Sequence, residues 1–313
     1  MHQHTRKIAV AFAASALTLL AASGCASLDQ WQRRAIFQHE TAARVDARWV
    51  PDGAQEFDLA LPGGGVSGAD RVRFWYLPAG AADAPTVLYL HGARHNLNGN
   101  AHRIERLHAL GFNVLAPEYR GFGQSTPILP SEQSAIEDAQ LAFAELQRRE
   151  PDAARRIVYG YSLGGAVAIA LAQQADGIAG VVVESTFTSI PDVVRTMRWG
   201  WVPFIGVAVT QRFDSLARIA QVDEPLLFIH GTADGIVPHT MSDRLYEAAR
   251  RVPPERKRVV KVNGATHRGA MSLDPGAYGR ALTEFVQSVV YRAPGGTAAA
   301  GAAAAALPHP ARN

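Results

Sequence analysis

The sequence predicts an α/β fold, in which a mostly parallel central sheet carries helices on both faces and a short helical insertion. Short apolar runs alternate with longer amphipathic stretches along most of the chain. The runs Val87–Leu90 and Leu226–Ile229 contain only apolar residues, as strands that are covered on both faces require. The expected strands are Val72–Leu77, Thr86–Leu90, Asn113–Ala116, Ile157–Tyr159, Gly180–Glu184, Pro225–Ile229 and Arg258–Val262. The expected helices are Ser131–Arg149, Gly164–Gln174, Thr240–Arg250 and Pro275–Tyr291.

The composition is that of a globular protein. The chain has 313 residues, of which 48% are hydrophobic and 19% charged, which argues against a disordered, fibrous or multi-span membrane chain. Its single cysteine excludes a disulfide framework and a cysteine-based zinc site. The 31 Lys and Arg residues against 28 Asp and Glu residues give a net charge of only +3, which is no nucleic-acid-binding footprint.

The N-terminal residues have the pattern of a signal peptide. Arg6 and Lys7 precede Ile8–Ala22, fifteen residues without a charge, which is too short for a membrane span but suits a secretory signal. Ser23 and Gly24 then precede Cys25, and small residues before a cysteine resemble the lipobox of bacterial lipoproteins. That resemblance implies a signal peptide over residues 1–24 and a diacylglycerol on the Cys25 thiol. An ordinary secretory signal with an incidental cysteine is the alternative.

The residues on either side of the cysteine bear on its location in the cell. Ala22 stands where lipoboxes usually have leucine, and Ala26, rather than aspartate, resembles the outer-membrane sorting pattern. We therefore expect a lipid-anchored protein of the bacterial cell envelope, on the outer membrane and facing the periplasm. Residues 25–60 are expected to be an anchored N-terminal segment with a helix over Gln30–Asp46, and residues 293–313 a disordered tail of Ala, Pro and Gly.

The most informative motif surrounds Ser162. Gly160-Tyr161-Ser162-Leu163-Gly164 is a G-x-S-x-G sequence between an expected buried strand and an expected helix, the context of a nucleophile elbow. The sharp turn strains the serine backbone, and glycines two residues away on each side let the neighbouring backbones pass. A tight glycine-rich turn with a solvated serine is the alternative.

A serine nucleophile needs a base, which in this arrangement follows an acid along the chain. His267 lies in a loop after the last expected strand, where the base is required. Of the other downstream histidines, His230 ends a strand, His239 lies near a helix start and His309 lies in the tail. His267 is therefore the predicted base, with a surface-loop histidine as the alternative.

Asp234 is the leading candidate for the acid. It follows the strand Pro225–Ile229, so its carboxylate can reach the His267 loop across the top of the sheet. Glu184, at the end of the preceding strand, and Asp223, before the strand, are rivals, and Asp234 could instead only form a turn.

Backbone amides are expected to complete the site. Ala93 follows His91-Gly92 at the end of a central strand, so its N–H should face the same point as that of Leu163, as an oxyanion hole requires. His91, His95 and His102 could also be read as metal ligands, but they lack the ligand spacing of a metal site. We expect no metal and no cofactor.

Five motifs stand out along the chain: Tyr119–Ser125, Pro130–Glu132 with Asp138, Ser162–Ala166, Glu184–Ser189 and His230–Pro238. They resemble motifs of the α/β-hydrolase superfamily, and the resemblance extends from about Val72 to Val290. Within it, they are similar to the small serine hydrolases related to eukaryotic protein depalmitoylases and their bacterial relatives. The resemblance implies an α/β-hydrolase domain over residues 61–292 with Ser162 as nucleophile, Asp234 as acid, His267 as base and the Ala93 and Leu163 amides as the oxyanion hole. Relatives often have His-Gly-Asn-Ala-Gly-Asn where this chain has residues 91–96.

An insertion at residues 186–224 occupies the place where such folds carry a lid. Trp199, Trp201 and Phe204 form an aromatic patch in it, which is predicted to line an acyl pocket or alternatively to pack on the core. A lid this short favours esters of short to medium acyl chains.

These features predict a serine hydrolase that cleaves carboxylic esters or thioesters through an acyl-enzyme intermediate. The expected partners are a small acyl ester or thioester substrate and a membrane, reached through the lipid anchor at Cys25, with no nucleic acid. A serine peptidase of the same fold and a catalytically inactive envelope lipoprotein are the alternatives.

Overall fold

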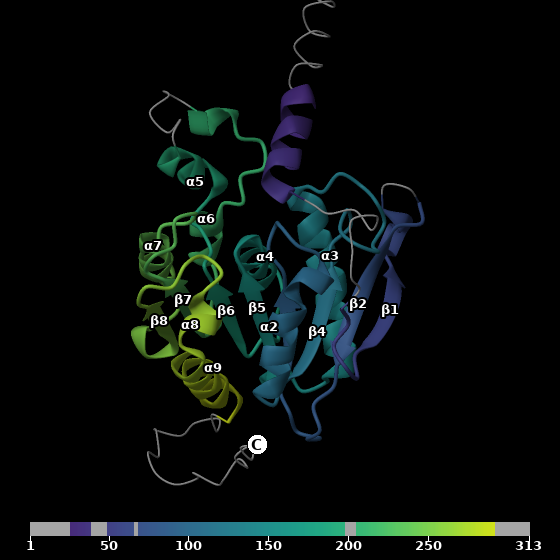
Figure 1. The fold of residues 1–313 in the computed structure, drawn as a ribbon, viewed down its shortest axis with the longest axis vertical. Helices are drawn as coiled ribbons and strands as arrows, with labels where there is room; N and C mark the ends of the chain where they lie inside the picture. The colour runs from purple at the N-terminus through teal and green to yellow at the C-terminus, as the bar shows by residue number, and fades with distance from the viewer. Residues whose placement is uncertain (1–25, 39–48, 66–67, 198–204, 292–313) are drawn as a thin grey trace, which may run out of the picture.

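The structure is a computed structural model that describes residues 26–38, 49–65, 68–197 and 205–291. Its core is an eight-stranded sheet with the order β1-β2-β4-β3-β5-β6-β7-β8 (Figure 1). Cys25, Trp199, Trp201, Phe204 and the predicted tail lie outside the described residues. The strands are β1 Gln55–Ala60, β2 Arg71–Leu77, β3 Thr86–Leu90, β4 Asn113–Glu118, β5 Arg156–Tyr161, β6 Gly180–Glu184, β7 Leu226–Gly231 and β8 Lys257–Val262.

The pairing confirms the predicted mostly parallel sheet. From β4 through β8 all neighbours are parallel, whereas β2 runs antiparallel to both β1 and β4. β1 was not predicted, because its sequence Gln-Glu-Phe-Asp-Leu-Ala mixes charges into a half-exposed edge strand. The sheet therefore begins at Gln55, inside the segment that the sequence assigned to the anchor. Since the remaining strands are parallel, their carboxyl ends meet at one edge of the sheet.

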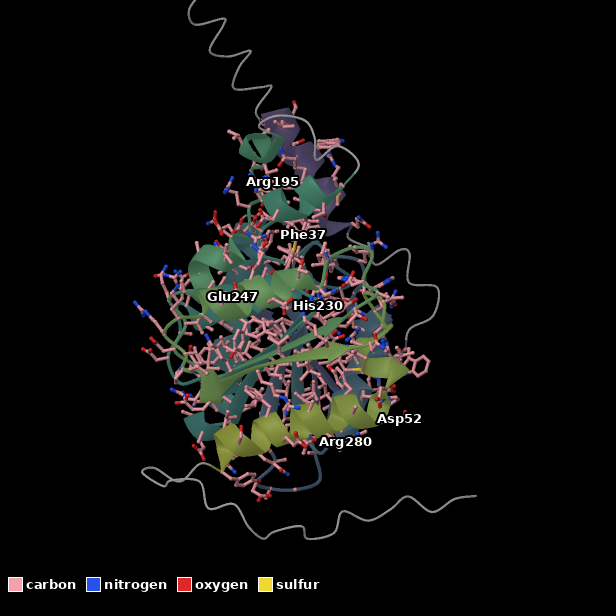
Figure 2. The ribbon with its side chains drawn as sticks, turned by 90° about the vertical axis from the view of Figure 1, so that its left-hand side faces the viewer. Phe37, Asp52, Arg195, His230, Glu247 and Arg280 are labelled. Carbon is pink, nitrogen blue, oxygen red and sulfur yellow. The ribbon has the colours of Figure 1, made fainter. Side chains whose placement is uncertain are left out.

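Helices cover both faces of the sheet, as predicted. One buried cluster includes side chains of α3, α4, α6 and α7, and a second includes side chains of α2, α8 and α9. In Figure 2, Arg280 of α9 lies on the opposite side of the strands from Phe37 and Arg195. The helix α2 was not predicted. The helices are α2 Leu97–Ala109, α3 Glu132–Arg149, α4 Leu163–Ala172, α5 Ile190–Thr196, α6 Ser215–Ile219, α7 Thr240–Ala248, α8 Ala270–Leu273 and α9 Pro275–Val290.

Two helices begin where the sequence predicts. The Ser131 hydroxyl accepts the Ser134 N–H at 3.0 Å, and the Ser134 hydroxyl accepts the Ser131 N–H at 2.9 Å, so α3 opens with a capping box. Asp274 caps α9, with Pro275 at its first position.

An N-terminal helix over residues 26–37 precedes the sheet. It begins earlier than the expected Gln30–Asp46 and ends at Phe37, whose side chain is fully buried beside Phe213. The helix lies at the same end of the molecule as α5, beyond the carboxyl ends of the parallel strands (Figure 1). Within the ranges that the structure describes, no helix is both long and apolar enough to cross a membrane.

A buried arginine joins three segments. Arg120, only 1% exposed, follows β4 and donates to the carboxylates of Asp70 before β2 at 2.8 Å and of Asp138 on α3 at 2.7 Å. Its remaining nitrogen lies 2.7 Å from Glu137. Because Asp70 and Asp138 are fully buried carboxylates, they depend on this cation for charge compensation.

His91, directly after β3, is a buried ring packed between Tyr119 and Phe122. Its Nδ1 lies 2.8 Å from the Gly92 carbonyl oxygen and its Nε2 lies 3.4 Å from the Tyr119 amide nitrogen, so the ring donates through Nδ1 and accepts through Nε2. Burial lowers the pKa of His91 to about 4. The ring is therefore neutral in the folded protein at neutral pH.

We expect Arg120→Met to lower the free energy of unfolding by about 3–5 kcal/mol, because it leaves two buried carboxylates without their cation. Urea unfolding followed by tryptophan fluorescence measures this. Arg251→Met is the matched control: its pair with Asp223 has side chains 55% and 67% exposed, and its loss should cost less than about 1 kcal/mol. Equal losses in the two variants would contradict this interpretation of the buried cluster.

His91 should also make stability depend on pH. Its folded-state pKa lies below that of the unfolded chain, so between pH 6.5 and 4 the unfolded state binds the additional proton. Stability is therefore complete above pH 6.5 and is lost as the pH falls toward 4. We expect His91→Asn, which keeps a donor for Gly92, to lose about 2 kcal/mol less than the wild type between pH 7 and 4.5. Urea unfolding at both pH values measures these losses, and an equal loss of stability in the wild type and in His91→Asn would contradict this expectation.

Candidate active site

Ser162 stands on a strained turn between β5 and α4. Its φ of 54° and ψ of −120° lie in a region that residues other than glycine rarely adopt. The turn is held by hydrogen bonds at both ends: the Ser162 N–H donates to the Glu184 carbonyl at 2.8 Å, and the Gly165 N–H donates to the Ser162 carbonyl at 2.9 Å. The side chain consequently stands clear of both elements.

The glycines of the motif are required by close contacts. A Cβ at Gly160 would lie 2.2 Å from the Gly164 carbonyl oxygen, and a Cβ at Gly164 would lie 2.1 Å from the Leu90 carbonyl oxygen. No side chain fits at either position, because both contacts are with backbone. The G-x-S-x-G pattern is thus explained by the packing of β5 and α4 against the end of β3.

The structure brings the three predicted side chains into one hydrogen-bonded row. His267 Nε2 lies 3.0 Å from Ser162 Oγ, and His267 Nδ1 lies 2.7 Å from Asp234 Oδ2. His267 comes from the loop after β8, and Asp234 from the loop after β7. Three segments far apart in the sequence therefore meet at the carboxyl edge of the sheet.

Backbone contacts join the two loops. The Ala233 N–H donates to the Ala265 carbonyl at 3.0 Å, and the Thr232 N–H donates to the Val262 carbonyl at 3.0 Å. A Cβ at Gly231 would lie 2.2 Å from the Ala265 carbonyl oxygen, so glycine is needed there for the loops to approach. The distance between Asp234 and His267 is thereby fixed by main chain.

The Asp234 carboxylate is held ionised. Its Oδ1 accepts the N–H groups of Ile236 and Val237, each at 2.9 Å, and its Oδ2 lies 3.1 Å from His230 Nε2. Burial raises the pKa of Asp234, but the hydrogen bonds from His230 and His267 and the adjacent imidazole outweigh it and hold the pKa well below its usual range.

His230 supports Asp234 rather than acting on Ser162. Its ring is fully buried, and its Nδ1 lies 2.6 Å from the Ser242 hydroxyl. The sequence places His230 only at the end of a strand, because nothing in the sequence shows that it contacts the carboxylate. Of the other candidates for the base, His239 immediately precedes α7 and His309 lies outside the described residues.

The two rival carboxylates are occupied elsewhere. Glu184 is fully buried and accepts from Arg103 at 2.9 Å, from Tyr278 at 3.0 Å and from Tyr159. Asp223 pairs with Arg251 at the surface. Neither has a hydrogen bond to His267 among those that the structure shows.

Arg103 on α2 links Glu184 to the His267 loop. Its guanidinium carbon lies 3.8 Å above the centre of the Tyr161 ring, and its Nη2 donates to the Arg268 carbonyl at 3.3 Å. Tyr161 in turn donates to the His267 carbonyl at 3.2 Å. Sequence reasoning missed Arg103, because α2 was not predicted and no motif contains it.

The two predicted amide donors flank the serine. Leu163 is the first residue of α4, so its N–H has no partner within the helix. Ala93 lies on the loop after β3, which passes so close that a Cβ at Gly92 would lie 3.3 Å from the Ser162 Cβ. Both residues line the same cavity as Ser162 and His267.

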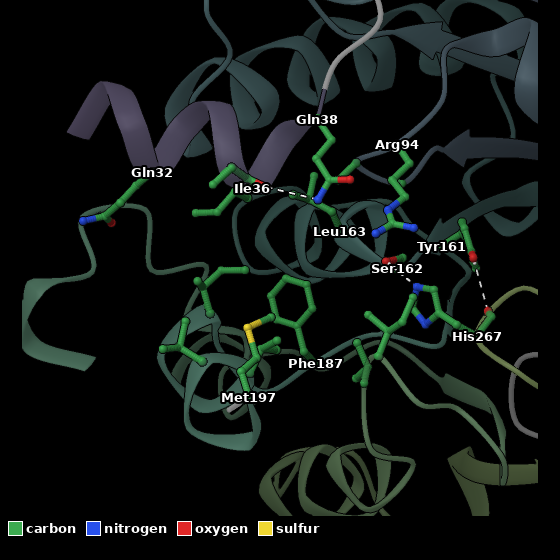
Figure 3. Close-up of a pocket in the computed structure, with 18 of the residues that line it drawn as sticks. Gln32, Ile36, Gln38, Arg94, Tyr161, Ser162, Leu163, Phe187, Met197 and His267 are labelled. Atoms are coloured by element: carbon green, nitrogen blue, oxygen red, sulfur yellow. Dashed lines mark hydrogen bonds between the residues drawn. The ribbon is translucent and has the colours of Figure 1, made fainter. Parts of the chain in front are cut away.

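The cavity beside Ser162 has a volume of about 630 Å³ and is mostly apolar (Figure 3). Arg94, which Figure 3 shows beside Ser162, and Arg268, which follows His267 in the chain, both line it, and the described residues that line it include no aspartate or glutamate. His95, read as a conceivable metal ligand, instead accepts from Arg268 at 2.7 Å. No group of three or more possible metal-binding side chains occurs in the described part of the chain.

Known proteins resemble the chain in sequence. A family model described as serine aminopeptidase, S33, matches residues 82–213. An uncharacterised protein of Mycobacterium tuberculosis is 34% identical over 279 residues, which cover 87% of this chain and 92% of that one. The α/β-hydrolase domain-containing protein WAV2 of Arabidopsis thaliana is 32% identical over 206 residues, 58% of this chain and 64% of that one.

A solved structure resembles the chain in fold. The Pyrococcus furiosus esterase Pf2001 superposes with a TM-score of 0.64 and 22% identity, over 79% of this chain and 98% of that one. The sheet order and the strained turn at Ser162 agree with the fold that these relatives indicate. This chain belongs to the α/β-hydrolase superfamily.

Proposed function

We propose that the protein is a serine hydrolase that cleaves carboxylic esters or thioesters. The observation that supports this most directly is the hydrogen-bonded row of Ser162, His267 and Asp234, with distances of 3.0 and 2.7 Å, whose first two residues line an apolar cavity. The row has the geometry that a nucleophile, a base and an orienting acid require.

In the first step, Ser162 Oγ attacks the acyl carbon while His267 Nε2 takes the hydroxyl proton. The carbonyl π electrons move to oxygen, and the Leu163 and Ala93 amides stabilise the resulting oxyanion. When the oxyanion collapses, the bond from carbon to the alcohol oxygen or thiol sulfur breaks. His267 returns the proton to that leaving group, and the acyl group stays on Ser162.

In the second step, water replaces the leaving group. His267 takes a proton from the water, whose oxygen attacks the acyl-enzyme, and the carboxylic acid leaves as Ser162 regains its proton. Asp234 remains ionised throughout, because four groups hold its carboxylate: the N–H groups of Ile236 and Val237 and the rings of His230 and His267. It stabilises the imidazolium and fixes the ring orientation.

A serine aminopeptidase of the same fold is the second candidate, favoured by the family model that matches residues 82–213. Such an enzyme must hold the charged α-amino group of its substrate, and a buried ammonium needs a counter-charge. The described lining has Arg94 and Arg268 but no carboxylate, which disfavours a cationic substrate. We therefore favour esters or thioesters over peptides with a free amino terminus.

A catalytically inactive envelope lipoprotein is the third candidate, and a fluorophosphonate probe separates it from both enzymes. We expect the probe to label the wild type, and Ser162→Ala to lose both the label and at least about 10⁴-fold of p-nitrophenyl ester hydrolysis, because the nucleophile is gone. Ser272→Ala, which changes an exposed serine of α8, is the control and should keep both. An unlabelled wild type, or equal labelling of Ser162→Ala, favours the inactive protein.

The same preparation separates esterase from peptidase. The wild type should hydrolyse p-nitrophenyl esters at least tenfold faster than amino-acid p-nitroanilides at equal concentration. The reverse order would favour the aminopeptidase.

We also propose that Cys25 carries a lipid that anchors the protein to the outer membrane, facing the periplasm. The signal-like residues 1–24 and the small residues before the cysteine support this. Each buried acyl methylene contributes about 0.8 kcal/mol, so several chains together hold a protein stably at a membrane.

Processing tests the anchor. In a bacterial host treated with globomycin, which blocks cleavage in front of a lipidated cysteine, we expect a larger precursor to accumulate on immunoblots. Cys25→Ser should abolish lipid labelling and release the protein from the membrane fraction. Normal processing of the wild type under globomycin would instead support an ordinary secretory signal.

A further inference from the structure

We infer that the N-terminal helix, residues 26–37, forms the acyl-binding wall of the cavity, so that the enzyme prefers acyl chains of about eight carbons or more. This inference rests on the proposed hydrolase function, and it assigns a specificity-determining role to a segment that the sequence suggested only as a tether. Figure 3 shows the helix beside the cavity, across from α5 and Met197.

One face of the helix is turned toward the cavity. Leu28, Trp31, Gln32, Ala35 and Ile36 all line it, and their spacing of i, i+3, i+4, i+7 and i+8 is that of a single helical face. Four of these five side chains are apolar. Trp31 is 66% exposed and Leu28 is 41% exposed, so these two side chains do not pack against the core and are available to a ligand.

The opposite wall is also apolar. It consists of Phe187 after β6, of Ile190, Val193 and Val194 on α5, and of Met197 directly after that helix. Met197 is 54% exposed, so its side chain is available to a ligand. An acyl chain attached at Ser162 would thus lie between two apolar surfaces, and burying it there is favourable.

Polar contacts fix the helix in this position. The Gln32 side chain donates to the Ala208 carbonyl at 2.7 Å and accepts the Thr210 N–H at 2.8 Å. Asp29 accepts from the hydroxyl of Thr210 at 2.7 Å and from the side-chain amide of Gln211 at 2.8 Å.

Two further contacts hold the other side and the end of the helix. Arg33 donates to the Pro130 carbonyl at 2.8 Å, and Phe37 is buried with its ring centre 5.9 Å from that of Phe213. These contacts fix the helix against the rest of the fold, so it forms a permanent wall of the cavity.

The length of the wall sets the expected substrate. From Leu28 to Ile36 the helix rises about 12 Å, at 1.5 Å per residue. Since a C–C bond is about 1.5 Å long, a wall of this length runs beside at least about eight carbons of an extended chain. The insertion alone favoured short to medium chains, and the helix extends that range.

A larger side chain on the cavity face of the helix tests the inference. We expect Ala35→Trp to lower the ratio of kcat/KM for p-nitrophenyl dodecanoate to that for p-nitrophenyl acetate at least tenfold, because each methylene excluded from the cavity costs about fourfold. Gln30→Trp places the same side chain on the opposite, exposed face of the helix and should leave the ratio unchanged.

Trp31→Ala is a second, independent variant that removes acyl contacts without adding bulk, and it should lower the same ratio in the same direction. Unchanged ratios in both Ala35→Trp and Trp31→Ala would overturn the inference while leaving the proposed function intact. An equal loss on acetate and dodecanoate would also overturn it, since the helix would then serve only the fold. A wild type that hydrolyses neither ester would refute the proposed function itself.

Discussion

The site depends on one steric constraint, the crowding of three backbone segments around Ser162. The carbonyl oxygen of Leu90 at the end of β3, the last residues of β5 and the first turn of α4 approach so closely that only glycine fits at 160 and 164. This crowding holds Ser162 at a φ of 54°, which costs of order 1–3 kcal/mol that the surrounding packing must offset. In return, it aims the hydroxyl, the Leu163 amide and the Ala93 loop at one place.

The other parts of the site are held by buried polar groups, whose burial is favourable only while every partner is present. Arg103 and Glu184 are 1% and 0% exposed, and together with Tyr161 they reach the backbone of the His267 loop. His230 holds the Asp234 carboxylate by a hydrogen bond from its buried ring. Buried pairs of this kind add little net stability, so their contribution here is the fixed position of the imidazole. The nucleophile is positioned by steric exclusion, and its base and acid by hydrogen bonds.

Local motifs made the three central residues predictable, whereas tertiary contacts decided the rest. Ser162, Asp234 and His267 could be selected because each follows a recognisable strand, and parallel strands bring their carboxyl ends together. The strand β1 was not predicted, because charged residues interrupt its alternation of polar and apolar residues. The helix α2 was not predicted, because its first turn, Leu-Asn-Gly-Asn, is mostly polar and contains a glycine. Arg103 and His230 carry no motif, so their roles emerge only when their partners are known. The N-terminal helix shows apolar spacing in the sequence, but the surface that it faces depends on the fold of residues 205–213.

The N-terminal helix supplies a second apolar wall to the proposed acyl site. In the described part of the insertion, α5 supplies apolar side chains on only one side of Ser162, and an acyl chain there would leave its other side in water. The N-terminal helix covers that side, and the polar contacts that attach it come from the side chains of Gln32, Asp29 and Arg33. Trp31 and Ala35 on the face that lines the cavity are thus both exposed, so these two side chains can vary in size without loosening the helix. Since the described part of the helix begins at residue 26, the lipid anchor proposed for Cys25 would hold this wall of the acyl site near the membrane surface.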